Sequence, residues 1–278
     1  MSELIHQINE SVNFIQSVSN IKPKIGVVLG SGLGNLVKEI EVEKSIAYRD
    51  IPHFPISTVE GHSGNLIFGK LSGVEVLAMS GRFHAYEGYS PVQISYPIRV
   101  MKSLGIETLL LSNASGAVNP TYKVGDLVII NDHISFFLPN PLIGKNENSL
   151  GLRFPDMSEP YSKKLIALAH KIGERFQIPL KEGVYVGSTG PTFETRAEYK
   201  LVKIIGGDLV GMSTVQEVIV ARHAGMSVFA ASVVTDLGIR NTDDIISHEE
   251  VLQAANAAEP KLAKLFKELA VAISKTGN

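Results

Sequence analysis

The chain has 278 residues, and its 26 lysine and arginine residues nearly balance 28 aspartate and glutamate residues. A net charge of -2 without a long basic run argues against binding to nucleic acid or to an anionic membrane. The absence of cysteine excludes disulfides, thiolate metal sites and cysteine nucleophiles. No apolar run approaches the roughly 18 residues of a membrane helix, and the N-terminal segment lacks an apolar signal core. We therefore expect a soluble, cytoplasmic protein with no nucleic-acid or membrane partner.

Helical and extended patterns alternate along the chain. Apolar residues at helical spacing predict a first helix over 2–19, followed by a buried strand over 24–29. Further strands are predicted at 64–71, 73–80, 106–112, 126–131, 181–188 and 226–235, and further helices at 91–104, 160–176, 195–205 and 215–224. This alternation indicates an α/β protein, a three-layer fold with a twisted mixed β-sheet flanked by helices. No linker, repeat or shift in composition divides the chain, so residues 1–278 are expected to form a single domain.

A capping signal marks the start of the C-terminal region. Ser247 and Glu250 form a capping-box pattern that predicts the beginning of a last long helix. Pro260 lies inside this expected helix, where a proline removes a backbone donor and clashes with the preceding turn. We therefore expect the last helix to be kinked or split in two at this residue.

The segment from Ile134 to Glu159 contains several prolines and glycines and shows no sustained periodicity. A structureless stretch of more than about 15 residues in a compact domain is usually a lid, a binding loop or an interface. A mobile surface excursion is the alternative. Phe136 and Phe154 are among several apolar residues of this segment that are costly to leave in water. We therefore expect an interface or active-site role.

The first predicted strand runs into a glycine-rich turn, Gly30-Ser31-Gly32-Leu33-Gly34. Backbone N–H groups of such a turn can converge on an anion, and the Ser31 hydroxyl adds a donor. The turn differs from a dinucleotide-binding fingerprint because Asn35 stands where that pattern needs its third glycine. It also lacks the Gly-Lys-Ser/Thr ending of a P-loop. By itself it is equally well explained as a structural turn.

A second polar segment, Gly81–Gly88, follows a predicted strand. The Arg82 guanidinium offers a planar fork of donors that suits phosphate oxygens. His84 can add a second donor, and Tyr86 a hydroxyl or a stacking face. The alternative is a polar surface loop with an ion pair to Glu87, which would have no function in binding.

A third segment, Gly211-Met212-Ser213-Thr214, lies between the apolar end of a strand and a helix. Thr214 and Glu217 have the spacing of a capping box, which places Ser213 just outside a helix N-terminus. Such an end carries partial positive charge and free N–H groups that attract anions. Capping accounts for Thr214 and Glu217 but not for Ser213.

A fourth segment, Gly190-Pro191-Thr192-Phe193-Glu194, lies at a strand-to-helix junction. Phe193 offers a planar apolar wall and Glu194 a carboxylate acceptor, two features that a heterocyclic base needs. A lone acid near a helix start more often only complements the helix dipole. The eight histidines show no His-Glu-x-x-His arrangement and no close pair, so no metal site is expected. No Gly-x-Ser-x-Gly elbow marks a hydrolase nucleophile.

Taken in order, these segments resemble the trimeric class of purine nucleoside phosphorylases and the related methylthioadenosine phosphorylases. Eight stretches with ordered spacing carry the resemblance over nearly the whole chain: Gly30–Gly34, Val59–His62, Gly81–Gly88, Ser112–Gly116, Arg153–Ser158, Gly190–Glu194, Val210–Arg222 and His248–Val251. Each alone is a weak signal, whereas eight in sequence are a strong one. The resemblance implies a nucleoside phosphorylase-like fold and the reversible phosphorolysis of purine (deoxy)ribonucleosides to free base and (deoxy)ribose 1-phosphate.

The resemblance also implies roles for individual residues. The catalytic residues would be His84, Glu194 and Asp236. Phosphate would be bound by Ser31, His62, Arg82, His84, Ser213 and the backbone N–H of Ala114. The nucleoside would contact Tyr86, Phe154, Phe193, Glu194, Val210, Met212, Asp236 and His248, of which His248 would reach the 5′-hydroxyl.

Two partners follow from the same resemblance. Phe154 resembles an aromatic residue that such enzymes donate into the site of a neighbouring subunit, which implies a homotrimer. Inorganic phosphate would be a co-substrate, and neither a cofactor nor a metal is implied. As the glycosidic bond lengthens, the sugar becomes oxocarbenium-like and the purine electron-rich, as in glycoside hydrolysis. Bound phosphate would stabilise the sugar cation and then attack it, while hydrogen bonds that strengthen in the transition state would stabilise the purine.

Two residues lead to opposite predictions about which purine base is bound. Glu194 is expected to accept from N1–H of hypoxanthine or guanine, and together with His248 it favours inosine and guanosine. Asp236 stands where the family's enzymes for 6-oxopurines usually have asparagine, and an ionised carboxylate cannot donate to N7. We therefore expect Asp236 to act as a neutral donor to N7, its pKa raised by burial, and to widen tolerance toward adenosine. The alternative is a methylthioadenosine or adenosine phosphorylase in which Asp236 accepts from the 6-amino group.

Three other classes of protein remain as alternatives. A non-catalytic nucleoside- or nucleotide-binding module would need only the glycine turn, so Arg82, His84 and Ser213 argue against it. A nucleosidase would use water in place of phosphate, and dependence on phosphate separates it from a phosphorylase. A dehydrogenase that binds NAD is the weakest alternative, because the glycine turn of this chain does not have the third glycine of the dinucleotide-binding pattern in its place.

Overall fold

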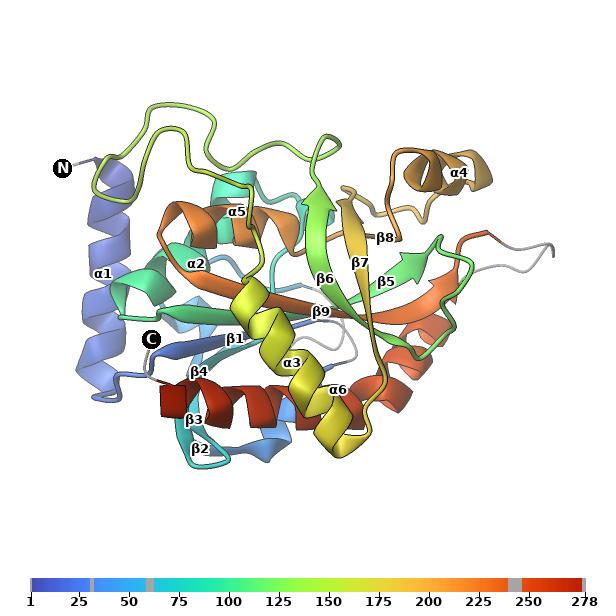
Figure 1. The fold of residues 1–278 in the computed structure, drawn as a ribbon. Coiled ribbons are helices and arrows are strands. Elements are labelled where there is room, and N and C mark those ends of the chain that lie inside the picture. The colour runs from blue at the N-terminus through green and yellow to red at the C-terminus, as the bar shows by residue number, and fades with distance from the viewer. Residues whose placement is uncertain (1, 31–32, 59–62, 240–246, 277–278) are drawn as a thin grey trace.

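The computed structural model describes residues 2–30, 33–58, 63–239 and 247–276. In this part of the chain the strands form one mixed sheet with the order β2-β3-β4-β1-β5-β8-β7-β6-β9 (Figure 1). The strands are β1 Ile25–Leu29, β2 Ile40–Ala47, β3 Asn65–Leu71, β4 Val74–Ser80, β5 Thr108–Ala117, β6 Leu127–Ile134, β7 Leu180–Gly187, β8 Leu209–Gly211 and β9 Ser227–Leu237. The α-helices are α1 Glu3–Val18, α2 Pro91–Ser103, α3 Lys163–Phe176, α4 Arg196–Ile204, α5 Val215–His223 and α6 His248–Thr276.

Four parallel strands, β4-β1-β5-β9, form the centre of the sheet. Strand β1 has the sequence Ile-Gly-Val-Val-Leu and is buried along its whole length, as expected for a strand covered on both faces. Gly30 follows it directly, and a Cβ there would lie only 2.8 Å from the Ser112 carbonyl oxygen of β5. The carboxyl ends of these strands therefore lie close together at one edge, where α/β proteins commonly bind ligands.

The sheet closes on itself at one side. Strand β5 pairs with both β8 and β9, so β5, β8, β7, β6 and β9 form a closed, barrel-like ring. In Figure 1, β6 and β7 cross steeply over β5 and β9. The twisted mixed sheet predicted from the sequence is confirmed, whereas its closure was not predicted because it depends on pairings between strands far apart in the chain. The single domain over residues 1–278 stays a prediction.

Helices cover both faces of the sheet. Helices α1, α2 and α5 pack together on one face, and α3 and α6 pack together on the other (Figure 1). The two faces contain separate hydrophobic cores. One is centred on residues such as Ile98 and Val218. The other contains Phe229 and Phe266, whose rings meet edge to face at 6.2 Å. The flanked, layered architecture predicted from the sequence is therefore confirmed.

The structure corrects two expectations about elements. Strand β2 was missed because it lies at the edge of the sheet with five consecutive exposed residues, and the short alternation that begins at Ile40 ends at a β-bulge after Val42. The last helix is not split in two, since α6 runs unbroken through Pro260, and the alternative of a kink stays a prediction. Ala255, Ala258 and Leu262 on either side of the proline are buried against the sheet, and this packing holds the two halves in one helix.

The aperiodic segment after β6 forms turns and irregular chain up to the start of α3. Phe136 and Phe154 are 91% and 85% exposed, whereas Leu138 and Met157 of the same segment are partly buried against the core. Within the described residues, no helix has the length and apolar character that crossing a membrane requires.

Candidate active site

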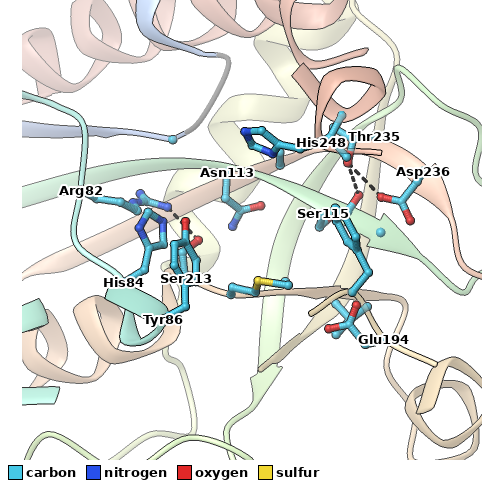
Figure 2. A pocket seen from close by; sticks show the side chains of 18 of the residues that line it. Arg82, His84, Tyr86, Asn113, Ser115, Glu194, Ser213, Thr235, Asp236 and His248 are labelled. Carbon is cyan, nitrogen blue, oxygen red and sulfur yellow. Dashed lines mark hydrogen bonds between the residues drawn. The ribbon is translucent and has the colours of Figure 1, made fainter. Parts of the chain in front are cut away.

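A cavity of about 110 Å³ opens at the carboxyl ends of the central strands. Figure 2 shows Arg82, His84 and Ser213 at one end of it and Glu194 and Asp236 at the other. We call these the cationic end and the carboxylate end. Most of the residues predicted from the sequence line this one cavity: Arg82, His84, Ala114, Ser213, Tyr86, Phe193, Glu194, Val210, Met212, Asp236 and His248.

Arg82 follows β4 and is only 1% exposed. Its Nη1 donates to Ser213 Oγ at 3.0 Å and to Thr214 Oγ1 at 3.2 Å. Its Nε lies 3.5 Å from Glu217 Oε1 on α5, and that carboxylate is also buried. A buried cation needs such a counter-ion, and the pair fixes the plane of the guanidinium. The cationic end is therefore built into the core and is not a surface loop.

Thr214 and Glu217 do not form the predicted capping box. Thr214 precedes α5 with a φ of 72°, and no side chain caps the helix. This left-handed conformation is costly for a β-branched residue and is typical of functional sites. The Thr214 hydroxyl accepts from Arg82 and from Asn113 Nδ2, the latter at 2.8 Å. The sequence suggested helix capping for Thr214 and Glu217, but in the structure their side chains contact Arg82.

His84 is oriented by Glu87. Its Nδ1 lies 3.0 Å from Glu87 Oε1, and its backbone N–H donates to the same oxygen at 2.9 Å. Burial opposes ionisation of Glu87, but hydrogen bonds from His84 and Thr58 outweigh it and lower the pKa of Glu87 to about 2. An ionised carboxylate can only accept, so His84 donates to Glu87 through Nδ1. The predicted ion-pair partner of this loop therefore positions a cavity residue.

Glu194 follows the loop after β7, and its Oε1 accepts from Ser188 Oγ at 2.8 Å. Burial raises the pKa of Glu194 above its ordinary value, and the charge of Asp236 adds to the rise. A simple helix-dipole role would place this carboxylate on the surface, whereas it lines the cavity. Glu194 is therefore a carboxyl whose charge depends on what lies beside it.

Asp236 reaches the cavity because of a β-bulge in β9. The register with β5 skips Thr235, so Ser115 pairs with Val234 and Gly116 with Asp236. Successive residues of a regular strand point to opposite faces, but both Thr235 and Asp236 line the cavity. Asp236 is 3% exposed, with Oδ1 at 3.1 Å from Thr235 Oγ1 and Oδ2 at 3.3 Å from Tyr199 OH.

Apolar and aromatic groups lie between the two ends. The Tyr86 ring stacks on His84 with ring centres 4.6 Å apart. Burial raises the pKa of the Tyr86 hydroxyl, which therefore stays protonated at neutral pH. Met212 is close to the backbone of Gly190, where a Cβ would meet its sulfur at 2.3 Å. His248, the first residue of α6, also lines the cavity and lies near Thr235 in Figure 2.

Three other predicted residues remain to be placed. Ser31 and His62 lie outside the described residues. Phe154 is absent from the cavity of its own chain and instead lines a separate surface hollow with Phe136 and Arg153, whose guanidinium lies 5.6 Å from the centre of the Phe154 ring.

Asn113 and Tyr199 are among the cavity residues that sequence reasoning missed. Asn113 lies between the two ends in Figure 2, and its Oδ1 is buried without a hydrogen-bond partner among the described residues. It belongs to the stretch Ser112–Gly116, so the motif pointed to it. Tyr199 carried no signal, because one tyrosine on an amphipathic helix is indistinguishable from a core residue.

Comparison with known proteins gives this site a family. The profile of the phosphorylase superfamily matches residues 24–270. Purine nucleoside phosphorylase 1 of Bacillus subtilis is 49% identical over 263 residues, which cover 95% of this chain and 97% of that one. Structures of the purine nucleoside phosphorylase of Schistosoma mansoni superpose with TM-scores of 0.91 in complex with inosine and 0.90 with adenosine. Both are 42% identical and cover 95% of this chain, and 95% and 96% of those chains respectively.

The chain belongs to the phosphorylase superfamily and, within it, to the purine nucleoside phosphorylases, which use phosphate as a co-substrate. Its activity is that of the purine nucleoside phosphorylases, pentosyltransferases that move the sugar of a purine nucleoside onto phosphate. The resemblance inferred from the eight sequence stretches is confirmed. Within the described residues, no group of three or more histidine, aspartate and glutamate side chains is placed to hold a metal ion.

Proposed function

We propose that this site cleaves inosine and guanosine, with phosphate at the cationic end and the purine at the carboxylate end. The observation that carries the proposal is the presence of both ends in one cavity (Figure 2). Buried Arg82 and the Ser213 hydroxyl supply an anion site, and Glu194 supplies an acceptor for N1–H of a 6-oxopurine. The sugar lies between them, against Tyr86 and Met212, with its 5′-hydroxyl toward His248.

The chemistry follows from the charges at the two ends. Lengthening of the glycosidic bond makes the sugar cationic, and the phosphate held by Arg82 and His84 stabilises it before attacking the anomeric carbon. The departing purine becomes electron-rich, and hydrogen bonds at the carboxylate end strengthen as it does so. The Thr214 strain and the buried Arg82–Glu217 pair position the anion site before substrate arrives.

Asp236 takes part in this scheme as a neutral acid that donates to N7. Its burial and the nearby Glu194 carboxyl both disfavour a second negative charge in the cavity. The carboxyl is held in place by two hydroxyl groups: Thr235 Oγ1 donates to Oδ1 at 3.1 Å, and Tyr199 OH donates to Oδ2 at 3.3 Å.

A second candidate is the phosphorolysis of adenosine or methylthioadenosine. Asp236 in its ionised form is a good acceptor for a 6-amino group, and the Schistosoma mansoni relative has been crystallised with adenosine. Glu194 and His248 favour the first candidate, because adenine has no hydrogen on N1 and because His248 suits a 5′-hydroxyl better than a 5′-methylthio group.

The full site requires a neighbouring copy of the chain. Phe154 is highly exposed and lies outside its own cavity, as expected of a side chain that enters another subunit's site. Exposed Phe136 in the same segment would be covered by the same contact. We therefore include a homotrimer in the proposal, together with a cytoplasmic location, where nucleosides and inorganic phosphate are both available.

The test is release of free base from inosine, guanosine, adenosine and methylthioadenosine, each with and without phosphate. Release from inosine and guanosine that depends on phosphate is the expected result. A preference for adenosine or methylthioadenosine would mean that Asp236 determines which base is bound, and would favour the second candidate. Release without phosphate would contradict the phosphorolysis mechanism.

A further inference from the structure

The side chain of Tyr199, on α4, fills a slot at the carboxylate end that the proposed scheme does not use. It is 3% exposed and lines the cavity together with Glu194 and Asp236. Gly238, directly after β9, makes this slot possible, because a Cβ there would lie 2.2 Å from Tyr199 Cδ1. The ring therefore packs directly on the backbone, and this packing fixes the position of its hydroxyl.

The Tyr199 hydroxyl donates to one particular oxygen of Asp236, Oδ2, at 3.3 Å. Burial raises the pKa of Tyr199, and the charges of Asp236 and Glu194 raise it further, so the phenol keeps its proton. Gly116 on β5 leaves room for the same carboxylate oxygen, since a Cβ there would lie 2.8 Å from Oδ2. Two neighbours thus fit closely around Oδ2 alone.

The other oxygen, Oδ1, has a different neighbour. It accepts from Thr235 Oγ1 at 3.1 Å, and the same hydroxyl lies 3.2 Å from the Ser115 carbonyl oxygen. Thr235 is the neighbour of Asp236 on β9, whereas Tyr199 lies on α4. The Tyr199 hydroxyl therefore ties the carboxyl to a second element of the fold.

We propose that Tyr199 is a positioning residue for the reaction: by donating to Asp236 Oδ2, it holds the carboxyl in the orientation from which Asp236 donates to N7 of the purine. The inference rests on the proposed role of Asp236 as a neutral donor. Without the phenol hydroxyl, the carboxyl can rotate, so fewer molecules present the donor. The loss concerns the departing base and leaves the distant cationic end unchanged.

The test is a double-mutant cycle of Tyr199→Phe and Asp236→Ala, with inosine and phosphate as substrates. Losing one hydrogen bond to a carboxyl lowers kcat/KM for inosine about tenfold, mainly through kcat, while KM for phosphate stays the same. In the Asp236→Ala background the same change has an effect of less than about twofold, because the interaction it removes is already absent. Tyr122→Phe is the matched control, since it removes another buried hydroxyl, which donates to the Glu182 carbonyl far from the cavity.

Gly238→Ala provides a second variant that keeps the hydroxyl but displaces the ring. It should lower kcat/KM in the wild-type background and have little effect in the Asp236→Ala background. Equal losses in both backgrounds, or no loss in Tyr199→Phe, would overturn the role of Tyr199. Wild-type kcat/KM in Asp236→Ala alone would instead overturn the proposed role of Asp236, so the two failures are distinguishable.

Discussion

The two ends of the cavity differ in how the fold sets their charge. At the cationic end, Arg82 is buried against the Glu217 carboxylate, and Glu87 holds His84 through a carboxylate whose pKa is lowered to about 2. At the carboxylate end, burial raises the pKa of Glu194, and Asp236 meets hydroxyl groups from Tyr199 and Thr235.

This difference suits the two reaction partners. Phosphate is always an anion, and a cation fixed by an internal counter-ion receives it without rearrangement. A purine changes its charge as it departs, and protons whose positions depend on the ligand can respond to that change. Each end can therefore be tested by a substitution that removes its charge or its proton.

The largest effect is expected from Arg82→Ala. Loss of a preorganised donor to the phosphate should lower kcat/KM about 10²–10³-fold, and saturation by phosphate should be lost. Removing one partner of a buried ion pair should also lower the free energy of unfolding by about 3–5 kcal/mol. Initial rates at varied phosphate and denaturant unfolding measure the two effects. In Arg82→Met/Glu217→Gln the stability should largely return while the activity does not, and joint recovery would contradict an anion-binding role.

The next largest effect is expected from Glu194→Gln, with opposite signs for activity and stability. Activity toward inosine should fall about 10²-fold, because an amide is a weaker acceptor than a carboxylate for N1–H. The pKa of Glu194 is raised in the fold, so the stability gained from its proton is present below the pKa of the unfolded chain. That stability is lost as pH rises through the higher folded value.

Glutamine avoids this loss, so the Tm of Glu194→Gln should exceed that of the wild type increasingly between about pH 4 and pH 7. Thermal unfolding over this pH range measures the difference. If the Tm of the wild type and that of the variant instead changed in parallel with pH, ionisation of Glu194 would not lower the stability of the fold.

A smaller effect is expected from Phe154→Ala. Loss of a donated aromatic contact should raise KM for inosine roughly tenfold, in proportion to the apolar area it covers, with little change in KM for phosphate. Sedimentation analysis checks the accompanying trimer. Mixing this variant with an Arg82→Ala variant tests donation directly: mixed trimers should contain some subunits with an intact site, and no gain of activity on mixing would mean that Phe154 serves its own subunit.

The smallest effect is expected from Asp236→Asn. An amide donates to N7 but cannot change protonation, so adenosine should lose several-fold more than inosine in kcat/KM, on the scale of one hydrogen bond. The ratio of the two kcat/KM values is the measurement. Unchanged turnover and unchanged base preference would mean that Asp236 does not act as a neutral donor.

Much of the site could be predicted from the sequence because its residues lie in short motifs at the ends of strands. Arg82 and Ser213 are separated by more than a hundred positions, yet each lies within two residues of a glycine at the end of an expected strand, and in the structure Arg82 Nη1 donates to Ser213 Oγ at 3.0 Å. Strand β2 and Tyr199 could not be predicted, since an exposed edge strand and a lone helical tyrosine carry no distinctive pattern.

By itself, the sequence determined the α/β class, the strand ends that carry the motifs and the membership of a phosphorylase family, because periodicity and glycine turns are local properties. Only the tertiary structure decided three other things. It closed β5-β8-β7-β6-β9 into a ring. It brought the side chains of Thr214 and Glu217 into contact with Arg82, where the sequence suggested helix capping. A bulge in β9 placed Asp236 between Tyr199 and Thr235. Each of these depends on pairings across the fold, which a local pattern does not encode.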